Sequence, residues 1–561
     1  MIYQVKPFHP PHSLLDTEHD SIHNSGISGE QRGNVMQHCT KLGRREFFYV
    51  STFAAAGAVF PDWTDFAFGS ESGPDKLPRV GLPPRPAEKP LNWKNRADSF
   101  DQYVMDPRNH VLQTRHDGTS YFASALEGTG DGGLTTFAPL ILGKILRADP
   151  VDSLLPSMAA YFSEEAGIFL DGTHADLCEY WYLMNVNALV SGIIRLKLAH
   201  DPIWMGRVRS SADRLIGLAH QISYDFNDQG YRFNTKVPFT NKDIYRQPDT
   251  VGGYAYVMLC AYEIFDEAKY LEEAKKGLHL YQSFANNPWY EIPSGAMAVM
   301  AAARLSVHDP EVNMLKVLNF ALDPNGHPLN TGTWGDKEVN GLMAGFSTEP
   351  VGEAYSMESL IVLPYILPTL QYRPEFATII GKYVLNTAAN MRLFYSDCIP
   401  RENQSRPDLT SAVPYERLTK ELDGHSPYAS GDYESHRSIY GGAYALWWGE
   451  LVKPTEDEYI LELNVSKSDF LAAETFPSYL YYNPYQAQKT ITLKLGESKV
   501  DIYDLVEQRF TNEKATGSFP VEIPANGSRL LVIVPSSAKR ELKKGILYGD
   551  GVPVDYRRTG K

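Results

Sequence analysis

The sequence predicts a mainly α-helical protein, in which an inner and an outer ring of helices precede a C-terminal antiparallel β-sandwich. Six similar helix starts recur between residues 131 and 440, amphipathic helices lie between most of them, and short alternating strands follow residue 454. Helices that others cover are apolar nearly all round, whereas outer helices keep one charged face. We therefore expect the inner helices to begin around one shared mouth.

Composition divides the chain into four segments. Residues 1–63 contain an export signal, and residues 64–125 form a linker and an N-terminal extension, with Pro and Gly concentrated at 70–90. Residues 126–453 carry the helical pattern, and residues 454–561 carry the strands. A chain of 561 residues is long enough for two or three domains.

The N-terminal segment resembles a twin-arginine export signal. Arg44 and Arg45 precede a short, weakly hydrophobic run that ends near Phe60. This run is shorter than the roughly 20 residues that a membrane-spanning helix needs. We expect a periplasmic or secreted protein with no membrane domain in its mature form. A buried helix is the alternative interpretation.

The helical segment alternates two kinds of helix. The six inner helices are expected to follow starts at Asp131, Gly172, Pro248, Ile292, Pro350 and Ser435. Outer helices are expected at 203–222, 267–284, 311–322 and 375–394. Gly252, Gly253, Gly441 and Gly442 fall in inner helices, where each costs about 1 kcal/mol relative to Ala. We attribute these glycines to crowding around a central axis.

The C-terminal segment predicts short strands separated by turns. The strands are expected at 459–465, 478–483, 489–495, 518–523 and 528–534. Asn483–Pro484 and Asn526–Gly527 are turn signals, and this spacing is typical of an antiparallel sandwich. A helical solenoid with a β cap is the alternative, but solenoid repeats have a more regular period.

Charge and composition narrow the choice of partners. The net charge of −15 argues against nucleic acid, which requires a basic face. The 34 Tyr, 25 Phe and 8 Trp supply flat apolar faces of the kind that sugar rings require, although any one of them can equally fill the core. The four cysteines show no short metal-ligand spacing. We therefore expect no disulfide framework, metal or cofactor.

A double ring of six helical hairpins followed by a β-sandwich resembles the (α/α)6 toroid carbohydrate-active enzymes. The domain order is similar to that of uronate-cleaving polysaccharide lyases of the chondroitin, hyaluronan and heparin types. The ring alone is similar to unsaturated glucuronyl hydrolases and related glucuronidases. Segments 480–484 and 500–505 look like the sandwich that often closes such enzymes. The resemblance covers most of the chain after residue 125 and implies an oligo- or polysaccharide substrate.

The segment 430–440 concentrates the residue types that β-elimination needs. Removal of the proton beside a uronate carboxylate requires a base, a group that neutralises the carboxylate, and an acid for the leaving oxygen. Tyr433 and His436 can act as base, Arg437 can hold the carboxylate, and Tyr440 can bind substrate. A capped helix with solvated charges is the alternative.

Three further clusters contribute expected binding and catalytic residues. His174, Glu179 and Asn187 follow the second inner start, where metal binding lacks the necessary ligand count. Tyr245, Arg246 and Tyr254 surround the third inner start. Lyases related to hyaluronan lyase use Asn, His, Tyr and Arg in a fixed order. These residues match that order only in part, because no His stands before Tyr245. The remaining expected site residues are Asp131, Trp334 and Glu353. The N-termini of the inner helices beside these residues would attract an anionic substrate.

Three functions follow from these clusters. The favoured one is β-elimination on a uronate-containing glycan, with Tyr433, His436 or Tyr254 as base. The second is glycoside hydrolysis by two carboxylates. These would be chosen from Asp131, Asp249, Glu349, Glu353 and Asp432. The third is a non-catalytic glycan-binding protein.

Overall fold

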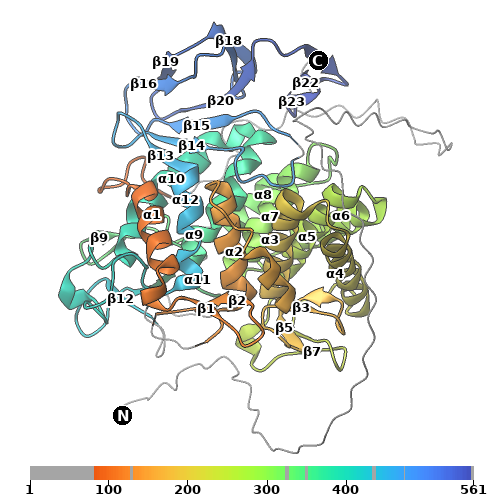
Figure 1. The fold of residues 1–561 in the computed structure, drawn as a ribbon. Coiled ribbons are helices and arrows are strands. Elements are labelled where there is room, and N and C mark those ends of the chain that lie inside the picture. Colours follow the sequence, from red (N-terminus) through yellow and green to blue (C-terminus); the bar gives the residue numbers. More distant parts are fainter. Residues whose placement is uncertain are drawn as a thin grey trace, which may run out of the picture. The chain divides into compact units, whose positions relative to one another are not determined.

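A closed inner ring of helices is the central feature of the computed structural model (Figure 1). Among the described residues, six ring positions are filled by α2 (Gly133–Leu146), α3 (Tyr180–Ile193), α5 (Thr250–Phe265), α7 (Ile292–Leu305), α9 (Ser356–Ile366) and the consecutive short helices α11 (Ile439–Gly442) and α12 (Ala445–Leu451). Each helix packs on the next, and α11 and α12 pack on α2, which closes the ring. The predicted inner ring is therefore confirmed.

The structure describes residues 81–126, 130–322, 328–347, 352–431, 437–472 and 474–557. The predicted export signal lies outside these ranges and stays a prediction. No described helix combines the length and apolarity that crossing a membrane requires.

Amphipathic helices cover the ring from outside. They are α1 (Trp93–Met105), α4 (Pro202–Gln221), α6 (Ala268–Ser283), α8 (Met314–Ala321) and α10 (Ala377–Asn390). The last four match the predicted outer helices, although α8 begins three residues later than 311. α4 begins where it does because the Asp201 side chain accepts hydrogen bonds from the Ile203 and Trp204 N–H groups.

Helix α1 is the outer helix that the sequence did not predict. It buries Trp93, Ala97, Phe100 and Val104, which recur every three or four residues on one face. That face packs on α12, and the rings of Trp93 and Trp448 lie 4.5 Å apart. After α1, β1 (Leu112–Thr114) pairs antiparallel with β2 (Ser120–Phe122).

The C-terminal region is an antiparallel β structure, as predicted. Within its described residues, a six-stranded sheet has the order β13-β14-β15-β20-β17-β18, and β16 pairs separately with β19. The strands are β13 (Val452–Pro454), β14 (Leu461–Asn464), β15 (Ser478–Tyr482), β16 (Lys489–Lys494), β17 (Val500–Asp504), β18 (Arg509–Ala515), β19 (Ser518–Ile523) and β20 (Ser528–Pro535). Ile491 and Val521 of the β16–β19 pair share a small apolar core with Ile502 and Leu531 of the sheet.

The sheet also contacts the helical ring, since β15 and β20 pack on α10. The tail adds a three-stranded sheet of β21 (Arg540–Lys543), β22 (Ile546–Gly549) and β23 (Val552–Asp555). That the layers form a sandwich of the predicted type stays a prediction.

Glycines allow close approach between the helices of the ring. A Cβ on Gly252 would lie 2.7 Å from the Ala298 Cβ on α7, and one on Gly442 would lie 2.4 Å from the Phe100 ring on α1. Such separations are too short for any side chain. Gly252 thus lies against the next inner helix and Gly442 against the outer helix α1, and crowding around the central axis itself stays a prediction.

Short strands shift two inner helices away from their predicted starts. β5 (Leu177–Glu179) pairs with β6 (Gly230–Arg232), and β6 pairs with β7 (Val237–Phe239), so α3 begins at Tyr180 rather than near Gly172. β10 (Glu353–Tyr355) pairs with β11 (Arg417–Thr419), so α9 begins at Ser356. These strands bring distant loops to the N-terminal ends of the inner helices.

Candidate active site

Carboxylates stand at the beginning of four consecutive inner helices. Glu179 directly precedes α3, Asp249 precedes α5, Glu291 precedes α7, and Glu358 lies in the first turn of α9. Glu179, Asp249 and Glu358 all act electrostatically on Glu291, so the four side chains form one group. We call these four residues the carboxylate cluster. The expected convergence of helix starts is thus found at α3, α5, α7 and α9.

Glu291 and Glu358 are the most strongly perturbed pair of the cluster. Desolvation raises the pKa of Glu291 well above its usual range, and the neighbouring charge of Glu358 raises it further. Desolvation also raises the pKa of Glu358, to about 8, with an added contribution from Glu416. The Glu358 side chain is buried, and its Oε2 has no hydrogen-bond partner among the described residues. At neutral pH such a pair keeps a proton that an ordinary pair of carboxylates would lose.

Two glutamine side chains hold Glu179 in place. Gln229 Nε2 donates to one carboxylate oxygen over 2.9 Å, and Gln247 Nε2 donates to the other over 3.1 Å. Gln247 is itself fixed, because its Oε1 accepts a hydrogen bond from the Trp181 backbone N–H over 2.9 Å. Desolvation raises the pKa of Glu179 although both glutamines oppose the rise. Glu179 is therefore oriented by neutral donors and keeps no cationic partner among the described residues.

Asp249 positions the backbone that carries Glu291. Its Oδ2 accepts a hydrogen bond from the Tyr290 N–H over 3.1 Å, and the Glu291 N–H also donates to this carboxylate. The residue is 1% exposed, and desolvation raises its pKa to about 7. Asp171 has the same role at α2, where its carboxylate accepts the Thr135 N–H over 2.7 Å and desolvation raises its pKa to about 6.

Tyrosine side chains surround the cluster. Tyr182 and Tyr440 are half-buried, and the Tyr440 hydroxyl lies 3.5 Å from Glu416 Oε1. Desolvation raises the pKa of both phenols, and Glu291 and Glu358 raise the pKa of both further. The Tyr290 ring packs 5.9 Å from the Phe346 ring. These phenols therefore stay protonated at neutral pH, so they serve as hydrogen-bond donors and as flat faces for a ligand.

Some residues predicted from the sequence lie at or beside the cluster. Glu179 is a member and Tyr440 is a neighbour. Glu353 lies on β10, where its carboxylate is 3.7 Å from Arg417 Nη1. Asp131 lies at the start of α2, where Arg115 Nε donates to it over 3.0 Å and the Tyr161 hydroxyl over 2.9 Å. Asp131 thus enters an ion pair at the edge of the ring.

Other predicted residues point elsewhere. The Tyr254 hydroxyl donates to Glu273 on α6 over 2.6 Å, which directs it between two helices. Arg437 is fully buried, and its guanidinium lies 3.5 Å from the centre of the Tyr415 ring. The structure gives these two side chains positions in the packing of the ring, and it does not bring them to the carboxylate cluster.

The remaining predicted residues occupy loops or lie outside the described ranges. His174 is exposed, Arg246 pairs with Asp228 over 3.1 Å, and Tyr245 packs 6.4 Å from Phe346. Trp334 is 6% exposed on β8 (Thr333–Trp334). Tyr433 and His436, with Asp432 and Glu349, lie outside the described residues.

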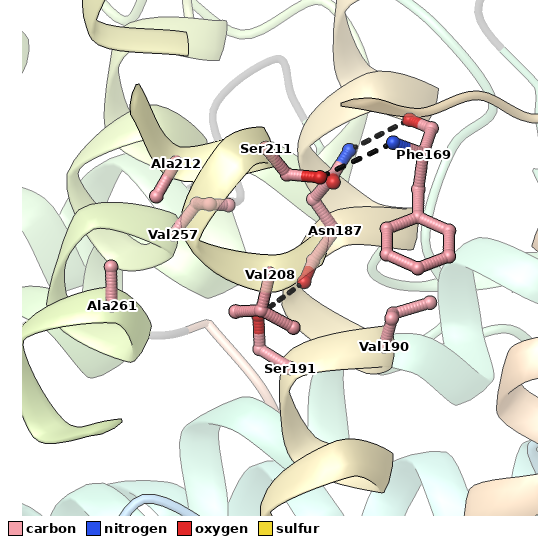
Figure 2. A pocket seen from close by; sticks show the side chains of 9 residues that line it. All are labelled: Phe169, Asn187, Val190, Ser191, Val208, Ser211, Ala212, Val257 and Ala261. Carbon is pink, nitrogen blue, oxygen red and sulfur yellow. Dashed lines mark hydrogen bonds between the residues drawn. The ribbon is translucent and has the colours of Figure 1, made fainter. Parts of the chain in front are cut away.

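A small internal cavity lies between α3, α4 and α5 (Figure 2). Its volume is about 10 Å³, enough for about one water molecule. Asn187 lines it, and the Asn187 amide donates to the Phe169 carbonyl over 3.0 Å and to the Leu183 carbonyl over 2.8 Å. Asn187 therefore bonds to backbone inside the helical packing, away from the helix starts.

Sequence reasoning missed three members of this region. Glu291 and Glu358 lie just outside the predicted helix-start motifs at Ile292 and Pro350, and Glu416 precedes β11, a strand that the sequence did not predict. The predicted start at Ile292 lay one residue after Glu291. The available signal was the residue immediately before each inner helix, which is acidic at α3, α5 and α7.

Comparisons with known proteins give fold-level similarity at low identity. Neither a scan of protein-family models nor a search of curated proteins finds a match to the chain. A family 76 glycoside hydrolase (mannosidase) from Bacteroides thetaiotaomicron superposes with a TM-score of 0.41 and 11% identity, over 64% of this chain and 98% of that one. Cellobiose 2-epimerase from Spirochaeta thermophila gives a TM-score of 0.41 and 10% identity, over 64% and 96%.

A possible family 105 glycoside hydrolase from Salmonella enterica gives a TM-score of 0.37 and 11% identity, over 64% of this chain and 92% of that one. Superpositions this weak carry no argument about activity. The function must therefore be argued from the geometry of the carboxylate cluster.

Proposed function

We propose that the protein is a carbohydrate-active enzyme that hydrolyses a glycosidic bond with Glu291 and Glu358. The observation that carries this proposal is the pairing of two carboxyl groups with raised pKa values at adjacent inner helix starts. Glycosidases of most families use two carboxyl groups, one protonated and one ionised, on either side of the scissile bond. Glu291 and Glu358 form such a pair, in which one carboxyl group can stay protonated while the other is ionised.

In this mechanism Glu291 is the general acid. Desolvation and the charge of Glu358 hold the pKa of Glu291 well above its usual range, so Glu291 stays protonated and can donate a proton to the leaving oxygen. Glu358 loses its proton first, because its charge raises the pKa of Glu291 while Glu291 adds nothing to that of Glu358, so the ionised Glu358 acts as base or nucleophile. Asp249 and the two glutamines keep Glu291 and Glu179 oriented, and Tyr182 and Tyr440 offer faces to a sugar ring.

The β-elimination that the sequence favoured is the competing mechanism. It needs a basic side chain and a cation for the uronate, and the raised pKa values of the Tyr182 and Tyr440 phenols leave almost none of either side chain ionised to act as base at neutral pH. Tyr433 and His436 are its remaining proposed bases. Export through the twin-arginine signal is likewise a proposal that rests on residues 43–60.

The decisive experiment incubates the full chain with neutral and uronate-containing oligosaccharides. Hydrolysis releases reducing ends without the ultraviolet absorbance of an unsaturated uronate, elimination releases both signals, and a binding protein gives neither. We expect new reducing ends without absorbance. Glu291→Gln and Glu358→Gln should each lower the rate by about 10²–10⁴-fold.

Glu272→Gln is the matched control, because Glu272 is exposed on the outer helix α6. It should retain the wild-type rate. Activity in both cluster variants equal to that of the control would remove the pair from the mechanism.

A further inference from the structure

A second group of metal-ligand types lies on the outer ring, apart from the carboxylate cluster. It consists of His279 on α6 and of Asp309 and Glu311, which follow α7. One potential ligand atom from each residue lies within 4.8 Å of the others. These three residues form no short sequence motif, because His279 lies far from Asp309 and Glu311 along the chain.

The contact between His279 and Asp309 is short but is not a hydrogen bond. His279 Nε2 lies 3.2 Å from Asp309 Oδ2, yet this buried nitrogen has no hydrogen-bond partner among the described residues. The Asp309 side chain is 9% exposed, so its charge lies largely out of water. A separation of this size leaves room for a metal ion bound to both atoms, since zinc bonds of about 2.0–2.2 Å place neighbouring ligands a little over 3 Å apart.

Hydrogen bonds fix the backbone around these residues and hold the three side chains close together. Gln282 lies on the same face of α6 as His279, and its side chain donates to the Glu311 carbonyl over 2.7 Å and accepts the Asn313 N–H over 2.8 Å. Asp309 Oδ1 accepts the Glu311 N–H over 3.0 Å, which leaves Oδ2 facing His279. Glu311 Oε2 is 4.0 Å from His279 Nδ1 and is free to swing, because the side chain is 78% exposed.

We propose that His279, Asp309 and Glu311 bind a divalent zinc ion that ties α6 to the segment between α7 and α8. One imidazole and two carboxylates are ligands that zinc accepts, and water fills the fourth position. An all-oxygen set would instead favour calcium or magnesium. Because the site joins two segments that are separate in the unfolded chain, zinc binding should stabilise the fold.

The test titrates zinc chloride, and separately calcium chloride, into the chelator-treated full chain by calorimetry. We expect one zinc ion per chain to bind through this site, little calcium binding, and a higher melting temperature with zinc. His279→Asn should weaken zinc binding by more than about tenfold, since loss of a direct ligand exceeds the effect of losing an outer partner. Asp309→Asn should act in the same direction.

His220→Asn is the matched control. His220 lies on the outer helix α4 and pairs with Glu273 over 2.8 Å, so its loss also removes a surface imidazole beside a carboxylate. It should bind zinc as the wild type does. Absence of zinc binding in the wild type, or equal affinity in His279→Asn and His220→Asn, would overturn the proposal. Melting temperatures of the metal-free variants within a few degrees of the wild type show that the comparison is between folded proteins.

Discussion

Glu358 is a buried carboxyl group whose position lowers the stability of the protein once it ionises. It is 4% exposed, one of its oxygens has no partner among the described residues, and its pKa is raised to about 8. A buried carboxyl without a cation is destabilising once it ionises, so the folded protein favours the protonated form.

This residue predicts a particular pH dependence. A carboxyl group whose pKa is higher in the folded than in the unfolded state binds more protons when folded. Its stabilising contribution is complete below the unfolded value near 4.3 and is lost as the pH rises toward 8. Between pH 5 and 8 the melting temperature of the wild type should therefore fall relative to that of Glu358→Gln.

Thermal unfolding of both proteins in parallel at several pH values measures this difference. We expect Glu358→Gln to melt a few degrees above the wild type at pH 8 while its activity is lost. Melting curves that stay parallel across the range would contradict the raised pKa.

At the scale of single residues, the sequence identified Glu179 and Tyr440 but missed Glu291 and Glu358. Burial of a carboxylate is a property of the ring, and nothing in the local sequence distinguishes Glu358 from a solvated glutamate of a first helical turn. Tyr254 was expected at the site, but its hydroxyl donates to Glu273 on the next helix. A contact of this kind between helices cannot be read from a one-dimensional pattern.

The ribbon β5-β6-β7 is the element that fixes Glu179. Gly230 on β6 lies against β5 so closely that a Cβ there would be 2.3 Å from the Cys178 carbonyl oxygen and 2.8 Å from the Glu179 Cα. Gly230→Ala must push the two strands apart and displace Glu179 from its glutamine donors. We expect a loss of about 1–3 kcal/mol in unfolding free energy, with a lower turnover rate.

Gly217→Ala provides the comparison in denaturant unfolding and in the activity assay. Gly217 is exposed on α4, and a Cβ there meets nothing within 4 Å. That variant should be slightly more stable, because Ala is the better helix former. Equal behaviour of the two variants would show that the contact between β5 and β6 does not position the site.

Long helices were predictable because their apolar periodicity extends over several turns, as in α4 and α6. The ribbons were not, since strands of three residues contain too few alternations to show a pattern. For this reason the starts of α3 and α9 were placed too early, and the carboxylates that the ribbons deliver were attributed to loops.

At the scale of the whole molecule, one buried ion pair joins the helical ring to the β-rich region. Asp469 follows β14, and it accepts hydrogen bonds from Arg304 on α7 over 3.1 Å, from the Tyr372 hydroxyl over 2.6 Å and from Gln371 over 3.1 Å. The Asp469 side chain is fully buried, and that of Arg304 is 9% exposed. Removing Asp469 would leave Arg304 with Glu263 as its remaining carboxylate partner, and would leave the buried Tyr372 hydroxyl and Gln371 amide without their acceptor.

Asp469→Ala should therefore destabilise the protein by about 3–5 kcal/mol, seen as a large drop in melting temperature. Calorimetry should also show whether the ring and the β-rich region still unfold together. Glu458→Gln is the control, since the Lys89–Glu458 pair is exposed and should contribute nothing measurable. A small effect of Asp469→Ala would mean that the two regions are held by apolar packing alone.

Ring closure has a consequence for the order of events during synthesis. Helix α12 (Ala445–Leu451) completes the circle by packing on α1 and α2, which end at Met105 and Leu146 and therefore leave the ribosome long before it. Until then the apolar flanks of the first helices have no permanent cover, and such distant contacts form slowly. Translation must therefore pass residue 451 of 561 before the ring that carries the carboxylate cluster can close.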